Sequence, residues 1–155
     1  MKQILIIIIA FGNLISQTIE KDKFMAEKVN KSETEWQTCL TPDEYHVLRN
    51  KGTEAAFTGK YYRHKEKGTY VCAACDNELF SSKTKFDSGS GWPSFYEAIS
   101  EGKIKYIEDK SLGMSRVEIV CAKCDSHLGH VFDDGPNPTG KRYCVNSASL
   151  DFNKK

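Results

Sequence analysis

Four of the six cysteines in this 155-residue chain form two Cys-x-x-Cys pairs, which constrain the fold more than any other feature. The pairs are Cys72 with Cys75 and Cys121 with Cys124, each after a β-like segment and before a polar turn. A Cys-x-x-Cys turn directs two thiolates toward one point, and two such turns complete a tetrahedral site suited to zinc. We therefore predict a structural four-cysteine zinc site, which requires the intervening chain to bring the two turns together.

Two other uses of these four cysteines stay open at the level of sequence. In an oxidising compartment they would form two disulfides, although a Cys-x-x-Cys disulfide closes a very small loop and cross-pairing would strain both turns. A thioredoxin-like redox motif is weaker still, because it belongs beside a βαβ pattern that this chain lacks. The spacing favours zinc.

The rest of the sequence predicts one mainly β domain of small antiparallel sheets. After Gly52, short segments rich in Val, Ile, Tyr and Thr alternate with Gly, Asp, Asn and Pro. The strand candidates are GTYVCAAC, KYIEDK, SRVEIVCAKC, HLGHVFDD and RYCVNSASLDF. The net charge of +1 comes from residues of mixed sign, so we expect no nucleic-acid partner.

Three short helices are predicted around these strands. Ser32–Cys39 and Thr41–Lys51 each begin with a capping box, and the second would end at Gly52. Pro93–Gly102 is predicted as the third helix, from a proline at its start and a glycine at its end. The buried faces of the first two helices would carry Trp36, Leu40, Tyr45 and Leu48.

The N-terminal segment has the pattern of an export signal. Met1 and Lys2 provide a positive start, and Ile4–Phe11 is an apolar run shorter than the roughly 20 residues of a membrane span. We predict a signal peptide over residues 1–16, a flexible linker over 17–31 and the folded domain over 32–155. We therefore expect a periplasmic or secreted protein with no stable membrane span. The alternative is a membrane anchor formed by an uncleaved N-terminus.

Cys39 and Cys144 lie outside the pairs, and the simplest role for each is that of a small buried apolar residue. The surroundings of Cys144 favour a reactive thiol. Arg142 lies two residues before it, where a guanidinium would lower the thiol pKa. Asn146 lies two residues after it, and strand alternation places all three side chains on one face.

Two histidines and two aromatic residues complete the candidate chemistry. His127 and His130 are most simply surface residues, and a second metal site is a weaker option. If the reactive cysteine lies nearby, the more specific hypothesis is that one histidine donates a proton and the other is its partner. Trp92 and Phe95 follow a glycine-rich turn in DSGSGWPSFYE. Trp92 would fit a core, but its flanking glycine favours an exposed aromatic platform.

Several motifs resemble those of the B-type methionine-R-sulfoxide reductases. They are GWPSF, HLGHVFDDGPNPTG and RYCVNSASL with the two cysteine pairs, and LTPDEYHVLRNKGTE and AFTGKY nearer the N-terminus. The resemblance extends from Glu33 to Phe152 and implies the β-tent fold with one structural Zn²⁺ per chain. It also implies thiol-dependent reduction of methionine-R-sulfoxide in oxidised proteins, with the free amino acid as a further candidate substrate.

The resemblance implies that Cys144 is the nucleophile, which attacks the sulfoxide sulfur and becomes a sulfenic acid. The oxygen would be positioned and protonated by His127, His130 and Asn146. Arg142 would be the basic residue near the nucleophile. The substrate methyl would pack against Trp92, with Phe95 beside it. These roles agree with the chemistry, which needs a reactive thiolate and a proton donor. An apolar wall would select one sulfoxide epimer.

The sequence departs from the family pattern at Ser90. Many members read SGCGWPSF and carry a resolving cysteine there, whereas this chain reads SGSGWPSF. Either Cys39 resolves the sulfenic acid for a thioredoxin-like reductant, or an external small thiol reduces it directly, which we prefer. We expect one of these reductants and oxidised proteins carrying methionine-R-sulfoxide as partners. We also expect the protein to be a monomer.

Two rival functions remain at this stage. One is an inactive zinc-knuckle binding module of the same fold, against which the complete row of Arg142, Cys144 and Asn146 argues. The other is a secreted structural protein stapled by disulfides, which would hold no metal and six oxidised cysteines.

Overall fold

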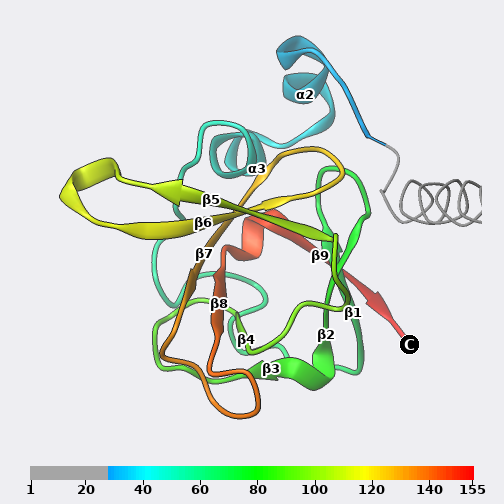
Figure 1. Ribbon diagram of the computed structural model, residues 1–155. Helices are drawn as coiled ribbons and strands as arrows, with labels where there is room; N and C mark the ends of the chain where they lie inside the picture. Colours follow the sequence, from blue (N-terminus) through cyan, green and yellow to red (C-terminus); the bar gives the residue numbers. More distant parts are fainter. Residues whose placement is uncertain (1–27) are drawn as a thin grey trace, which may run out of the picture.

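The computed structural model describes residues 28–155, so the predicted signal peptide and the predicted linker up to residue 27 lie outside the described residues. Two antiparallel sheets make up most of the domain (Figure 1). One sheet has the strand order β2-β1-β9 and the other has the order β3-β4-β8-β7-β6-β5. The bounds are β1 (Gly68–Cys72), β2 (Glu78–Ser81), β3 (Lys85–Phe86), β4 (Ser94–Phe95), β5 (Ile104–Asp109), β6 (Arg116–Cys121), β7 (His127–Phe132), β8 (Arg142–Val145) and β9 (Leu150–Lys154). The predicted mainly β fold is confirmed.

Two α-helices precede the sheets, α2 (Glu33–Cys39) and α3 (Pro42–Leu48), and three short 3₁₀ turns are η1 (Ser82–Thr84), η2 (Ser111–Gly113) and η3 (Ser147–Ser149). Both predicted capping boxes are present, and they begin the helices by satisfying otherwise free backbone N–H groups. The second helix ends at Leu48, before the predicted Lys51, because Lys51 adopts a left-handed φ of 55°.

Trp36, Leu40 and Leu48 are buried as predicted, and Tyr45 is half-buried. Within residues 28–155, no helix is long and apolar enough to cross a membrane.

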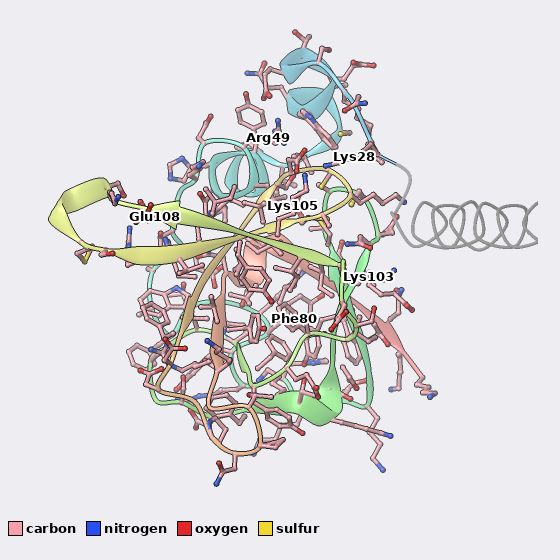
Figure 2. All side chains as sticks on the ribbon, viewed as in Figure 1. Lys28, Arg49, Phe80, Lys103, Lys105 and Glu108 are labelled. Atoms are coloured by element: carbon pink, nitrogen blue, oxygen red, sulfur yellow. The ribbon has the colours of Figure 1, made fainter. Side chains whose placement is uncertain are left out.

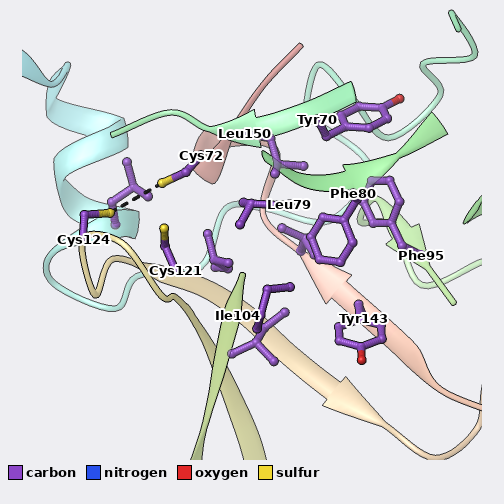
Figure 3. Packing of buried hydrophobic residues seen from close by; sticks show 14 of the residues in the cluster. Tyr70, Cys72, Leu79, Phe80, Phe95, Ile104, Cys121, Cys124, Tyr143 and Leu150 are labelled. Atoms are coloured by element: carbon purple, nitrogen blue, oxygen red, sulfur yellow. Dashed lines mark hydrogen bonds between the residues drawn. The ribbon is translucent and has the colours of Figure 1, made fainter. Parts of the chain in front are cut away.

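The core contains a cluster of aromatic rings between the sheets (Figure 3). Phe80 stacks on Phe95 with ring centroids 4.3 Å apart, and Tyr70 packs edge-on against Phe95 at 5.0 Å. Full burial of such a ring contributes about 1.5–3 kcal/mol to the free energy of unfolding. The predicted helix over Pro93–Gly102 is wrong, because pairing of β4 with β8 outweighs the local helix signals.

The first described residues contact the second cysteine turn. The Val29 N–H donates to the Lys123 carbonyl at 2.9 Å. Lys28 and Lys105, both labelled in Figure 2, form ion pairs of 2.8 and 2.7 Å with Asp125. The last residues of the predicted linker therefore lie against the domain.

Candidate active site and metal centre

The four paired cysteines meet in one cluster. Their Sγ atoms all lie within 4.8 Å of one another, with Cys72 to Cys124 at 3.7 Å and Cys75 to Cys121 at 3.6 Å. Zinc–sulfur bonds of about 2.3 Å in a tetrahedron place neighbouring sulfurs about 3.8 Å apart, so the donor set fits this ion. All six cysteines are free, which argues against the disulfide alternative.

The two turns of the cluster have the same local structure. Asp76 and Asp125 each follow a pair with a left-handed φ, of 57° and 58°. In each turn the Asp N–H donates to the carbonyl of the first cysteine, at 2.9 Å in both cases. Hydrogen bonds among the four thiols, that of Cys124 first, lower the pKa of Cys121, while the hydrogen bond with Cys121 is the largest cause that raises the pKa of Cys72 and of Cys75.

The cluster lies where the two sheets meet. Cys72 ends β1 of the three-stranded sheet and Cys121 ends β6 of the six-stranded sheet. Figure 3 shows the sulfurs at one end of the buried core. A metal ion at this point would therefore hold the sheets together.

Cys144 lies in the middle of the large sheet, beside a small pocket. Its strand β8 pairs with β4 on one side and β7 on the other, which places Cys144 opposite Ser94 and His130. The pocket has a volume of about 150 Å³, and the residues of its wall that matter here are Trp92, Arg116, His130, Phe132, Cys144 and Asn146. A reactive thiol, a histidine, an amide and an aromatic ring therefore share one cavity.

His127 and His130 lie close together because β7 carries a bulge. Ile119 pairs with Gly129 and the next residue of β6 pairs with His127, so Leu128 is an extra residue. Residues three apart would otherwise face opposite sides of a strand. The bulge instead places the two imidazole rings 5.6 Å apart.

Each histidine is held by a carboxylate from another strand of the large sheet, Glu118 of the adjacent β6 and Asp109 of β5 beyond it. His130 Nε2 lies 2.8 Å from Asp109 Oδ2, which also accepts from Arg116 at 2.7 Å. His127 Nδ1 lies 2.7 Å from Glu118 Oε1. Hydrogen bonds hold the pKa of Asp109 well below its usual range, from the Ser111 hydroxyl and amide first and then from His130.

Glu118 and His127 form a buried pair. Burial raises the pKa of Glu118, but the ammonium of Lys51 and the ring of His127 outweigh it, and the net pKa is lowered. Burial also lowers the pKa of His127 more than Glu118 raises it. The His127 ring is buried and does not line the pocket, so its role is to pack behind His130 and not to contact a ligand.

The segment before Ala55 fixes the other side of the pocket. Trp92 Nε1 donates to the Glu54 carbonyl at 3.1 Å, and Asn146 Oδ1 accepts from the Glu54 N–H at 3.2 Å. The Glu54 carboxylate accepts from the backbone N–H groups of Ser147 and Ala148 at 2.6 and 3.0 Å. These bonds hold the indole and the amide in place.

The Cys144 thiol has a raised pKa. Burial is the largest cause, and hydrogen bonding by Ser90 and the charge of Arg142 lower the pKa by less. Arg142 therefore lowers the pKa of Cys144 as predicted, but burial raises that pKa by more. Arg142 does not line the pocket with Trp92; its guanidinium makes two 2.9 Å bonds to Asp134.

Two other expectations are corrected by the structure. Phe95 is fully buried and stacked on Phe80, so it lies in the core instead of beside the substrate. Cys39 is exposed on α2, and Figure 1 draws α2 at the top of the molecule and β8 in its lower half. A Cys39–Cys144 disulfide would need a large rearrangement, because disulfide-bonded Cα atoms lie within about 7 Å.

Comparison with known proteins identifies the family. The SelR domain model matches residues 40–154. The chain belongs to the SelR domain family. It is 64% identical over 129 residues to a peptide methionine sulfoxide reductase MsrB from Methanosarcina barkeri, which covers 83% of this chain and 91% of the relative. MsrB proteins from Leptospira interrogans and Synechococcus are 60% and 57% identical, over 84% and 86% of this chain and 100% and 98% of theirs.

Sequence reasoning missed four residues of this SelR domain site, Glu54, Asp109, Arg116 and Glu118. Only Glu118 left a signal, since it is the single acid between apolar residues in the segment VEIVC. The other three reach the site through long-range strand pairing or backbone contacts that have no local pattern.

Proposed function

We propose that this SelR domain protein reduces methionine-R-sulfoxide in proteins to methionine, with Cys144 as the nucleophile. The observation that carries the proposal is the shared pocket of Cys144, His130, Asn146 and Trp92. The name of the relatives, peptide methionine sulfoxide reductase, supports the reaction class. The free amino acid is a second candidate substrate.

The reaction transfers one oxygen atom. The Cys144 thiolate attacks the sulfoxide sulfur, and an S–S bond forms as the oxygen gains a proton. The hydroxyl then passes to Cys144 Sγ: the S–S bond and the substrate S–O bond break while an S–O bond to Cys144 forms, which gives the sulfenic acid. The methionine leaves as the thioether. The two electrons that reduce the sulfoxide come from Cys144, and the thiol proton reaches the oxygen through the histidine.

Each pocket residue has a part in this step. His130 lies opposite Cys144 and, with Nε2 held by Asp109, presents its other ring nitrogen for proton transfer. The Trp92 ring offers an apolar wall for the substrate methyl, and Asn146 a polar group for the oxygen. With the methyl and oxygen placed in this way, only one epimer directs its sulfur at Cys144.

We propose that the four-cysteine cluster binds one structural Zn²⁺. The ion would supply folding free energy and no reaction chemistry, because four protein ligands leave no open coordination position. Its support is the fit of the sulfur spacing.

The raised pKa of Cys144 makes the proton donor important. Where burial disfavours the thiolate, protonation of the sulfoxide oxygen draws the reaction forward. We infer that an external thiol reduces the sulfenic acid directly, because the separation of α2 from β8 argues against Cys39. After one turnover without reductant, mass spectrometry should find a sulfenic acid and a free Cys39; a Cys39–Cys144 disulfide would contradict this route.

Turnover of separated R and S epimers of a methionine-sulfoxide peptide tests the main proposal. Wild type should reduce the R epimer, and Cys144→Ser should be inactive. Equal use of both epimers, or full activity of the variant, would overturn it. A folded, metal-loaded wild type without turnover would support the inactive binding module.

We further propose that residues 1–16 direct export. The basis is the charged start and apolar run of the sequence. A reporter fused to residues 1–17 should be exported and processed, and Ile7→Asp should abolish both effects. Export without cleavage would support a membrane anchor, and a reporter retained at its site of synthesis would refute the proposal.

A further inference from the structure

A second cavity lies next to Cys144 and shares no wall residue with the pocket that holds Trp92. Its volume is about 430 Å³, and its lining includes Phe86, Ser88, Ser90, Asp134 and Arg142. Ser90 Oγ is 3.9 Å from Cys144 Sγ, so a residue in the wall of this cavity contacts the nucleophile.

The proposed function leaves the oxidised enzyme without a resolving cysteine at Ser90. We propose that this second cavity binds a low-molecular-weight thiol carrying both an ammonium and a carboxylate group, which reduces the Cys144 sulfenic acid. The inference rests on the proposed function, since it requires that intermediate.

The charged groups of the cavity suit a zwitterionic ligand. Asp134 accepts from Nε and Nη2 of Arg142, which leaves the donors of Nη1 for a carboxylate. The Asp134 side chain is 61% exposed and can accept from an ammonium, whereas Arg142 is 15% exposed. One ligand therefore meets a positive and a negative partner side by side.

Hydroxyl groups continue this polar surface to the nucleophile. Ser88 Oγ lies 2.8 Å from Ser90 Oγ and 2.7 Å from Ser94 Oγ. A small ligand can follow these hydroxyls to Cys144, which is half-buried. A protein dithiol would have to insert its own cysteine into the same cavity, so the concave shape favours the small thiol.

The step balances with two thiols. The first thiolate attacks Cys144 Sγ, a mixed disulfide forms, and the sulfenic S–O bond breaks to release hydroxide, which leaves as water after protonation. The second thiolate attacks the sulfur of the bound small thiol and returns the Cys144 thiolate. Two thiols are oxidised to one disulfide while the sulfenic acid is reduced.

The first test compares thiols of different charge on the preformed sulfenic acid, at equal thiolate concentration. The probes are cysteine (both charges), cysteamine (ammonium only), 3-mercaptopropionate (carboxylate only) and 2-mercaptoethanol (neither). Cysteine should react fastest and with saturation, and loss of either charge should slow the reaction about threefold, as for a partly exposed ion pair. Equal, unsaturable rates for all four would overturn the proposal.

The second test uses cavity variants. Ser88→Phe fills the cavity, and it should slow cysteine-dependent turnover about tenfold or more while the first, single-turnover burst of methionine stays normal. Thr58→Phe, which adds the same bulk in a different surface hollow, is the control and should change neither. Asp134→Asn keeps an acceptor for Arg142 and should remove the preference for cysteine over 3-mercaptopropionate.

The outcomes separate this inference from the proposed function. If wild type produced no single-turnover burst of methionine, the proposed reaction itself would be refuted. A normal burst with unchanged turnover of Ser88→Phe refutes the cavity alone. Turnover of wild type by a thioredoxin-like protein and by none of the small thiols would also refute it, and would assign recycling to a protein partner.

Discussion

At the scale of single residues, the environment of Cys144 is the least expected feature. A neighbouring arginine usually indicates a thiolate at neutral pH, yet burial of this sulfur outweighs Arg142 and Ser90. A raised pKa lowers the thiolate fraction, so we expect the free thiol to react slowly with unspecific reagents. Reactivity depends on the substrate oxygen gaining a proton as well as on the charge of the cysteine.

This balance predicts the pH dependence of Cys144 alkylation. Because burial raises the pKa of Cys144 above its ordinary value, the thiolate fraction should keep rising about tenfold per pH unit through about pH 8. Iodoacetamide labelling measured by mass spectrometry should show no plateau near neutrality. Arg142→Gln should slow labelling further, whereas Lys141→Gln, at the neighbouring exposed position, should not. A plateau below pH 8 would contradict the raised pKa.

Asp109 acts as a positioning residue, since it touches His130 and no reacting atom. Asp109→Asn should lower kcat about tenfold, less than the 10²–10⁴-fold that loss of the acid–base group itself would cost, and leave KM unchanged. The matched control is Glu108→Gln, which removes an exposed carboxylate paired only with Lys110. Steady-state kinetics with an R-sulfoxide peptide check this, and a rise in KM at constant kcat would contradict the role.

At the scale of elements, the bulge in β7 determines the site. Without the extra residue Leu128, His127 and His130 would face opposite sides of the sheet. Gly129 is part of this bulge, with φ of 153°, and its Cα lies against the carbonyl of Cys144. The strand can approach the nucleophile because that position has no side chain.

Gly129→Ala should therefore be strongly destabilising. Its Cβ would overlap the Cys144 carbonyl oxygen, so overpacking of about 1–3 kcal/mol adds to the strain of a positive φ, about 1–2 kcal/mol. Gly113→Ala, with φ of 69° and open space around it, should show the strain alone. Denaturant unfolding measures the free energy of unfolding of both variants. Equal losses of stability would mean that the contact between position 129 and the Cys144 carbonyl is not costly.

The elements also show what sequence can and cannot reveal. The capping boxes and cysteine turns are local patterns of a few residues, so both were predictable. The β4 strand was not, because its two residues are held by β8, far along the chain, while Pro93 gave a local helix signal. The partners of the histidines, Asp109 and Glu118, depend on pairing and on a bulge that the alternation of side chains does not encode.

At the scale of the whole molecule, the four-cysteine cluster connects the two sheets. Cys72→Ser should remove the metal and lower the thermal midpoint by far more than Cys39→Ser, which changes an exposed cysteine outside the cluster. Metal analysis and thermal unfolding test this. If Cys72→Ser keeps both the metal content and the thermal midpoint of wild type, the structural zinc assignment is wrong.

The same cluster constrains the order of events when the chain folds. The cysteines in contact between the two turns are 46 and 52 residues apart along the chain. Each Cys-x-x-Cys turn can therefore bring its own two thiols together long before the two turns meet. An unfolded chain in excess zinc can therefore load a separate ion on each pair, and two occupied pairs cannot merge until one ion dissociates. Refolding should be fastest near one equivalent of zinc and slower above it, which makes metal supply a kinetic control on how much active enzyme matures.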